Sequence, residues 1–197
     1  MPNKQPYNNI SLYDEYKNLN SKIDKDILKS EFNYLGVSEF SGGGELNEEF
    51  QYLTRTEINK DKQLMININA IMSNSFYNGY RLAFNNNDIY CFIKDSNNTD
   101  IVYCACAFVN KENNLYHSQA KGYFIHSLCT NVNYRKRGFC SKLLNYIIDD
   151  LIPKNEYLYM EVDKNNNKAI SVYKKIGFEI INNNSNSDRY LCKYKKN

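Results

Sequence analysis

The sequence lacks most of the patterns that mark metalloproteins, secreted proteins and membrane proteins. It has only two histidines, His117 and His126, and none of its six cysteines forms a CxxC pair, so no metal site is expected. No apolar run approaches the ~20 residues that span a bilayer. The N-terminal stretch MPNKQPYNNI has no apolar core, which argues against a signal peptide. We therefore expect a cytoplasmic protein with reduced cysteines and no membrane partner.

Two common nucleotide-binding motifs are also missing. Neither GxxxxGK followed by Ser or Thr nor GxGxxG occurs in the chain. No long basic run or recognisable nucleic-acid-binding motif is present either, so nucleic acid is not expected as a partner. Charge is nevertheless uneven, because residues 121–197 hold 14 Lys and Arg against 7 Asp and Glu. This excess suits a polyanionic ligand, and ordinary surface asymmetry is the alternative.

What the chain does contain is the pattern of one mixed α/β domain. Its 197 residues are 42% hydrophobic and 24% charged, as in soluble globular proteins. Alternating or continuous apolar stretches predict strands at 50–58, 89–94, 101–109, 121–132, 157–162, 178–181 and 190–194. Apolar residues three and four apart predict helices over 61–77, from Gly138 to Leu151, and from Ala169 to Ile176. The order β-α-β-β-β-α-β-α-β-β indicates a central sheet with flanking helices.

Residues 1–49 differ from the rest of the chain. Apolar positions at helical spacing over 11–35 predict an N-terminal helical extension, and SGGGE at 41–45 reads as a hinge. We therefore place the main domain at 50–197. The extension is a helical cap over the substrate, a dimerisation arm that makes a homodimer, or a small appended subdomain, and the sequence leaves these open.

The stretch NYRKRGFCSKLL at 133–144 follows a predicted strand and begins a predicted helix. A helix N-terminus presents free backbone N–H groups and the positive end of the helix dipole, which together favour an anion. Gly138 allows close backbone approach or a positive φ, and Arg135 and Arg137 can add charge-assisted hydrogen bonds. A phosphate cradle is one interpretation, and a solvated basic turn is the other.

This stretch resembles a motif of a known family. Residues Arg135 to Cys140 match Q/R-x-x-G-x-G/A, the acetyl-coenzyme A motif of the GNAT superfamily of N-acetyltransferases, with Cys140 at the last small position. A second block resembles the family helix N-x-x-A-x-x-x-Y-x-K-x-G-F. Its matching residues are Asn166, Ala169, Tyr173, Lys175, Gly177 and Phe178. The resemblance covers about residues 50–197 and implies the GNAT fold.

The resemblance implies a site for acetyl-coenzyme A as cosubstrate. Backbone amides of the motif loop would hold the pyrophosphate, and the residues there are Arg135, Lys136, Arg137, Gly138, Phe139, Cys140 and Ser141. The pantetheine arm would lie between strands 121–132 and 156–162 and pair with the backbone at Leu128 and Thr130. An amide near Cys129 would polarise the thioester carbonyl. Asn166 would contact the coenzyme or simply cap its helix.

Three side chains are candidates for proton transfer. Tyr173 matches the usual general acid of the family, because a phenol with a pKa of ~10 can protonate a departing thiolate of pKa ~8.5. Core packing is its alternative role. His126 stands where many family members have a Glu and would act as a base or through a water, or be purely structural. Glu161 is the reserve base, and alternation does not settle which face it uses.

The resemblance implies direct transfer of an acetyl group to a primary amine of a small amine, an amino sugar, a peptide or a protein. The segments that build the acceptor site in this fold offer aromatic residues that could contact an amine by cation–π interaction, or simply pack. They are Phe76, Tyr77, Tyr80 and Tyr190. A GNAT-fold module that binds an acyl-coenzyme A without turnover is the alternative function.

Overall fold

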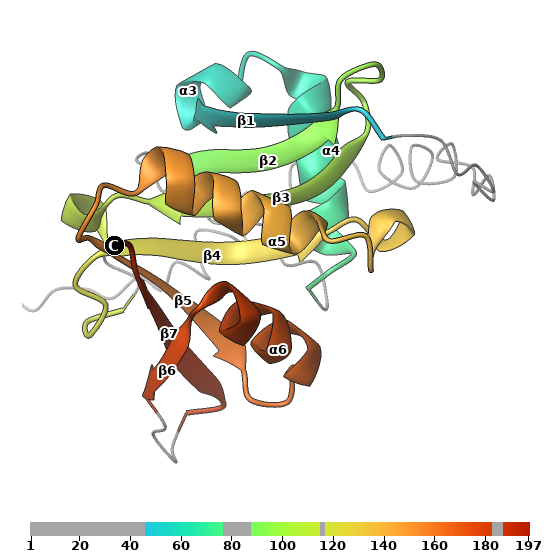
Figure 1. Cartoon of the computed structure of the whole chain (residues 1–197). Helices are drawn as coiled ribbons and strands as arrows, with labels where there is room; N and C mark the ends of the chain where they lie inside the picture. Colours follow the sequence, from blue (N-terminus) through green and yellow to red (C-terminus); the bar gives the residue numbers. More distant parts are fainter. Residues whose placement is uncertain (1–45, 77–87, 115–116, 183–186) are drawn as a thin grey trace, which may run out of the picture. The chain divides into compact units, whose positions relative to one another are not determined.

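A computed structural model describes residues 46–76, 88–114, 117–182 and 187–197 of the chain. The predicted helical extension therefore lies outside the described residues, apart from its last four positions. Figure 1 shows one sheet with helices packed against it. The mixed α/β fold predicted from the sequence is confirmed.

The sheet has seven strands in the order β1-β2-β3-β4-β5-β7-β6. The strands are β1 (Glu48–Thr54), β2 (Ile89–Asp95), β3 (Val102–Val109), β4 (Tyr123–Thr130), β5 (Tyr157–Asp163), β6 (Glu179–Asn182) and β7 (Arg189–Lys195). All neighbouring pairs are antiparallel except β4 and β5, which are parallel. The helices are α3 (Arg55–Ile58), α4 (Lys62–Ser73), α5 (Phe139–Tyr146) and α6 (Asn167–Ile176). Short helical turns are η1 (Lys111–Asn113), η2 (Val132–Tyr134) and the π-helical η3 (Ile147–Leu151).

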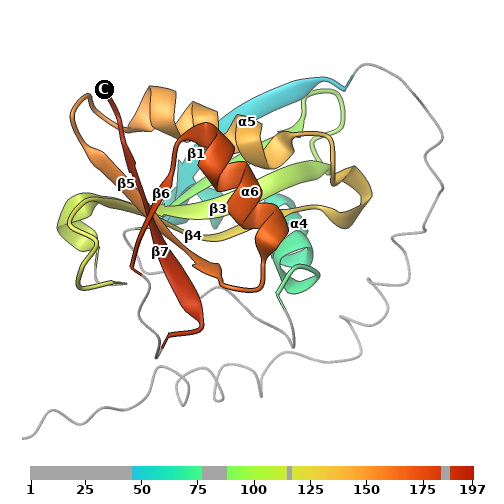
Figure 2. The ribbon, with the colours of Figure 1, turned by 60° about the horizontal axis from the view of Figure 1, so that its bottom comes forward.

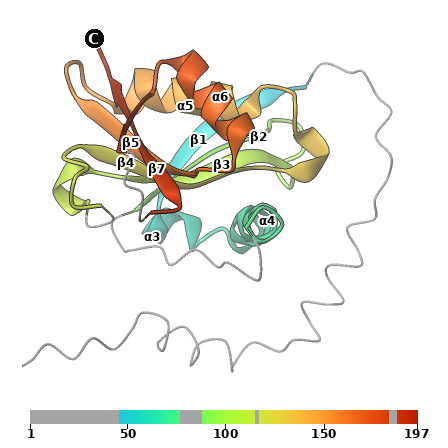
Figure 3. The ribbon, with the colours of Figure 1, turned by 90° about the horizontal axis from the view of Figure 1, so that it is seen from below.

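Helices cover both faces of the sheet. Figure 3 shows α5 and α6 on one side and α3 and α4 on the other. Strand β3, predicted to be central because it is apolar throughout, is buried at every position. Its residues alternate between two apolar clusters: Cys104 and Cys106 pack with α5, while Ala105 and Ala107 pack with α4.

One predicted element ends earlier than its apolar pattern suggested, and another reaches its predicted end but changes its type of helix. The strand expected over 50–58 stops at Thr54, whose side chain accepts a hydrogen bond from the Glu57 N–H and begins α3. The Glu57 carboxylate accepts from the Thr54 N–H in return, which completes a capping box. The helix expected from Gly138 to Leu151 changes to a π-helical turn at Ile147, shortly before Pro153. Apolar spacing marks the buried face in both cases but does not report these local hydrogen bonds.

Strand β4 contains an irregularity that separates it from β5. Its register with β3 slips between Ala105 and Ala107, so that β4 carries one extra residue there. Ser127 in this bulge has φ 57°, a left-handed value uncommon for a residue with a side chain. Before the bulge β4 pairs with β5, with Ile125 opposite Met160 as the last pair. Beyond that pair the two strands diverge, as Figures 1 and 2 show.

Candidate active site

The divergence of β4 and β5 leaves backbone groups of β4 facing away from any strand. The Asn131 N–H donates to the Tyr103 carbonyl of β3 at 2.9 Å. Because successive peptide groups of a strand alternate in direction, Cys129 also faces β3, whereas Leu128 and Thr130 face the opening toward β5. The Thr130 carbonyl accordingly accepts from Nε of Arg135 at 3.2 Å, away from β3. The amide near Cys129 that is directed into the opening is thus that of Leu128.

The loop before α5 presents unpaired amides next to this opening. Its backbone turns at Lys136, with φ 65°, and at Gly138, with φ 84°. The first backbone bond of the helix runs from the Lys142 N–H to the Gly138 carbonyl at 3.0 Å, so the N–H groups of Phe139 to Ser141 have no partner within the helix. A Cβ added at Gly138 would meet no heavy atom within 4 Å. Free amides beside open space at a helix N-terminus fit a pyrophosphate.

The side chains of the loop are mostly committed to the protein itself. The Arg135 guanidinium donates to the Thr130 carbonyl and, at 3.4 Å, to Ser75 Oγ after α4. The Arg137 guanidinium lies 5.5 Å from the centre of the Tyr134 ring. Phe139 is buried and stacks on Tyr103 with ring centres 4.5 Å apart. The backbone of this loop is therefore better placed than its side chains to bind an anion, and Arg135 ties the loop to β4.

Tyr173 lies on α6 and is buried among thiols. Burial raises the pKa of its phenol, and the nearby Cys140, Cys192 and Cys104 raise that pKa further. Its hydroxyl makes no hydrogen bond with another residue in the part of the chain that is described. The neighbouring Cys140 thiol shows how this environment acts on sulfur, because burial raises its pKa to about 12. The phenol thus keeps its proton, and a thiol produced beside it would also hold a proton more tightly than in water.

The start of α6 shows that Asn166 caps this helix. The Asn166 side chain accepts a hydrogen bond from the Ala169 N–H at 3.2 Å, so Asn166 is the N-cap of α6. Gly177 ends the helix with φ 110°. Contact of Asn166 with a coenzyme stays a prediction, as does a coenzyme contact for Tyr173.

His126 and Glu161 stand at the point where β4 and β5 part. They directly follow Ile125 and Met160, the last residues paired between these strands. Ile125 and Met160 both belong to the cluster under α5, so their successors face the opposite side of the sheet. That side is the one on which α4 packs, since Ala107, opposite His126, contacts the α4 cluster. The structure therefore brings the two candidate bases to the same face and the same level.

Both ring nitrogens of His126 have polar neighbours. Nε2 lies 3.3 Å from Oδ2 of Asp88, a carboxylate that is 1% exposed just before β2. Nδ1 lies 3.0 Å from Oγ of Ser127, the bulge residue. Sequence reasoning missed both partners. Asp88 is distant in the sequence, and the bulge that turns Ser127 toward its neighbour leaves no pattern in the chain.

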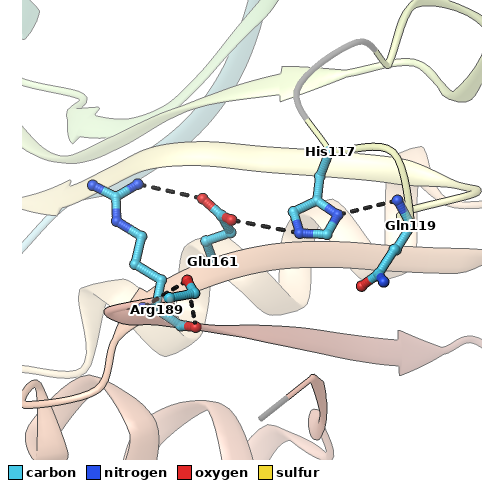
Figure 4. Close-up of polar contacts among 5 residues, drawn as sticks. His117, Gln119, Glu161 and Arg189 are labelled. Carbon is cyan, nitrogen blue, oxygen red and sulfur yellow. Dashed lines mark hydrogen bonds and ion pairs between the residues drawn. The ribbon is translucent and has the colours of Figure 1, made fainter. Parts of the chain in front are cut away.

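Glu161 belongs to a second polar cluster, shown in Figure 4. Its Oε2 accepts from Nη1 of Arg189 on β7 at 3.3 Å, and its Oε1 lies 3.7 Å from Nε2 of His117 in the loop before β4. The His117 Nδ1 accepts from the Gln119 N–H at 3.2 Å. Arg189 follows a loop and His117 precedes a turn, so neither lies in a motif that the sequence could have revealed.

Of the four aromatic residues expected around the acceptor, the two that the structure describes lie on opposite faces of the sheet. Phe76 lies just after α4 and packs on the α4 cluster. Tyr190 lies opposite Val162 and packs in the cluster under α5 and α6, on the other face, with Lys164 Nζ 5.4 Å from its ring centre. Tyr77 and Tyr80 lie outside the described residues. A role for these residues in acceptor binding stays a prediction.

The Cys129 thiol donates to the Ala105 carbonyl at 3.6 Å, and burial raises its pKa, so it is not an activated nucleophile. Within residues 46–197, leaving aside the undescribed gaps, no cluster of three His, Cys, Asp or Glu side chains could hold a metal ion. None of the described helices is long and apolar enough to cross a membrane.

Comparisons with known proteins agree with this fold. The family model described as the acetyltransferase (GNAT) family matches residues 57–178. The fold resembles that of the ribosomal-protein-S18-alanine N-acetyltransferase from Escherichia coli, with TM-score 0.54, 12% identity and coverage of 74% of this chain and 92% of that one. It also resembles Arabidopsis thaliana Naa50 in complex with the bisubstrate analogue CoA-Ac-MVNAL, with TM-score 0.53, 20% identity and coverage of 76% and 99%. Such identities show a shared fold. No curated protein sequence matches the chain.

Proposed function

Because the chain belongs to the GNAT family of acetyltransferases, we propose that it transfers the acetyl group of acetyl-coenzyme A directly to a primary amine. The observation that carries this proposal is the parting of β4 and β5, which has His126 and Glu161 at its start and the N-terminus of α5 nearby. An extended polar arm can replace the missing strand partner there, while an anion takes the free amides of the helix.

The residues that would hold the coenzyme divide by chemistry. The amides of Gly138, Cys140 and Ser141 suit the pyrophosphate, because they are uncommitted and stand beside open space. The backbone of Leu128 and Thr130 suits the pantetheine amides, because it faces the opening. The bound coenzyme would supply an acetyl thioester, and the Leu128 N–H would act as a fixed hydrogen-bond donor to the carbonyl oxygen.

Tyr173 fits the role of general acid in this proposal. Its raised pKa keeps the phenol protonated at neutral pH, so the proton is available when a thiol departs. Burial disfavours the charged form of both a phenol and a thiol. The pKa values of the phenol and of the departing thiol therefore rise together. The apolar surroundings thus add little to the free-energy cost of proton transfer from the phenol to the thiolate.

The acceptor must lose a proton as well. A primary amine with a pKa of ~10.4 is about 3.4 units above pH 7, so supplying the neutral amine costs about 4.6 kcal/mol. Glu161 is suited to attract the ammonium form, because it is a carboxylate at the opening on the face of α4. His126, on the neighbouring strand, is suited to receive this proton, directly or through another group, because a neutral imidazole has one nitrogen that accepts a proton.

The acceptor class is proposed as a primary amine in general. Peptide amines are the first to test, since the similar structures include the ribosomal-protein-S18-alanine N-acetyltransferase and the Naa50 complex with the bisubstrate analogue CoA-Ac-MVNAL. Small amines and amino sugars complete the panel. A cytoplasmic location, which reduced buried thiols favour, belongs to the same proposal.

Calorimetric titration with acetyl-coenzyme A, followed by an assay of free-thiol release with each amine, tests the proposal. Saturable binding and release with one amine class would establish the activity and its substrate class. Binding with no release for any amine would support a module that binds the coenzyme without turnover. Absence of binding would refute the coenzyme site itself.

A further inference from the structure

A chain of three polar residues connects a buried carboxylate to the opening between β4 and β5. Oδ2 of Asp88 lies 3.3 Å from Nε2 of His126, and Nδ1 of His126 lies 3.0 Å from Oγ of Ser127. Acid, imidazole and hydroxyl thus follow one another at hydrogen-bond distance. This order is that of a carboxylate–histidine–serine array, in which the imidazole is held by the acid and acts on the hydroxyl.

The bulge in β4 is what makes this array possible. Neighbouring side chains of a regular strand point to opposite faces and cannot contact each other. Ser127 has φ 57°, and this left-handed backbone turns its side chain to the His126 side. A serine at positive φ is in a strained backbone conformation, and such conformations concentrate at functional sites. The strain here has a chemical result, because it brings a hydroxyl to an imidazole.

The neighbouring groups fix the direction of each hydrogen bond. A carboxylate offers only acceptor atoms, so Nε2 of His126 carries the proton that faces Asp88. In neutral imidazole Nδ1 is then the acceptor, and the Ser127 hydroxyl is the donor to it. A hydroxyl oxygen that donates its proton keeps two lone pairs, so Ser127 Oγ can still accept a proton from an amine. The resting state is therefore set to pass a proton toward His126.

We propose that Ser127, and not His126, is the group that takes the proton from the attacking amine; this rests on the proposed function. As the amine nitrogen bonds to the acetyl carbon, its N–H proton passes to Oγ of Ser127. The hydroxyl proton of Ser127 passes at the same time to Nδ1 of His126. The imidazolium that forms is stabilised by the Asp88 carboxylate. Serine ends as a neutral hydroxyl, so it forms no bond to the acetyl group.

This arrangement gives His126 and Glu161 different tasks. Both carboxylate oxygens of Glu161 lie near cationic or polar groups, Arg189 at 3.3 Å and His117 at 3.7 Å. Glu161 is thus part of an exposed ion-pair network and serves to attract an ammonium group. His126 acts through Ser127 and is a positioning and proton-accepting residue one step away from the substrate.

The hydrogen-bond order can be tested without substrate. Because the chain has only two histidines, long-range ¹⁵N–¹H spectra of the free protein can be assigned with the His117→Gln variant. We expect neutral His126 as the Nε2–H tautomer, and a changed Nδ1 signal in Ser127→Gly, which keeps the positive φ without strain. The Nδ1–H tautomer in the wild type would overturn the proposal, because Ser127 would then be the acceptor.

Kinetics of Ser127→Gly then test the proton relay, by which we mean proton transfer from the amine through Ser127 to His126. With the amine identified by thiol release, we expect kcat to fall about 100-fold, as for loss of a general base. The acetyl-coenzyme A Kd should stay within about twofold, and Asp88→Asn should lower kcat about tenfold. Ser96→Ala, at an exposed turn after β2, is the control and should behave as wild type. Turnover of Ser127→Gly within about threefold of wild type would overturn the relay.

Mass spectrometry distinguishes the relay from a covalent role of Ser127, in which the serine would carry the acetyl group. After incubation with acetyl-coenzyme A and no amine, the relay requires unmodified Ser127. An acetyl group on Ser127 would overturn the relay in favour of a covalent step. Absence of turnover by the wild-type protein on every amine would refute the proposed function. If the wild type is active and Ser127→Gly is equally active, only the relay is refuted.

Discussion

Replacing Gly138 by alanine tests the coenzyme site at one atom. In the free protein the added methyl group would meet no heavy atom within 4 Å, so it causes no clash. Its cost is backbone strain alone, because Gly138 has φ 84° and a left-handed conformation costs a residue with a Cβ about 1–2 kcal/mol. For a domain of this size that loss lowers Tm by about 2–8 °C. The protein should still fold.

Binding should suffer more than folding. The methyl group would occupy the open space beside the free amides of α5, where the pyrophosphate must approach the backbone closely. We expect the Kd for acetyl-coenzyme A to rise at least about tenfold, which is about 1.4 kcal/mol. S-acetylpantetheine, which lacks the pyrophosphate, should bind Gly138→Ala and the wild type equally. Calorimetry with the two ligands measures both expectations.

Gly177→Ala is the matched control. Gly177 also has a positive φ, 110°, and ends α6, and its added Cβ would lie 3.3 Å from the Tyr194 ring. This variant should therefore lose at least as much stability as Gly138→Ala, yet keep the wild-type Kd for acetyl-coenzyme A. Two results would refute the assignment of the pyrophosphate to the α5 N-terminus. One is an unchanged affinity of Gly138→Ala for acetyl-coenzyme A, and the other is an equal loss of that affinity in Gly177→Ala.

Three further changes follow from the site. Tyr173→Phe should lower kcat about 100-fold and leave the coenzyme Kd unchanged, and a weakened Kd would mean that the hydroxyl serves binding. Glu161→Gln should raise the amine KM about threefold to tenfold at low salt, whereas the control Glu112→Gln should leave it unchanged. Equal effects of the two variants would exclude attraction of the ammonium group by Glu161. Burial raises the pKa of Cys140 to about 12 and that of Cys192 to about 11, so their alkylation by iodoacetamide should accelerate about tenfold per pH unit from pH 8 to 10; a plateau near pH 9 would contradict this.

The fold and the coenzyme loop could be predicted because their signals are local. The apolar run at 101–109 marks a buried central strand, and the glycine that follows Arg137 marks a helix start that the structure confirms at Phe139. The surroundings of the candidate bases could not be predicted in this way. They depend on Asp88, which is 38 residues from His126 in the chain, and on a one-residue slip in register at Ser127. A slip in register is set by tertiary packing and leaves no periodicity to read.

The short seam between β4 and β5 has a consequence for how the molecule opens. Only three residue pairs join β1-β2-β3-β4 to β5-β7-β6 in the described sheet, whereas β1 and β2 share seven. The two groups of strands are thus natural units of partial unfolding, and amide protons of β5 should exchange with solvent by an opening that spares β3. A ligand arm that makes hydrogen bonds to both β4 and β5 beyond their last residue pair acts as a strand shared by both units. At a concentration of 100 Kd it would add about 2.7 kcal/mol to the unfolding free energy and merge the two exchange classes into one.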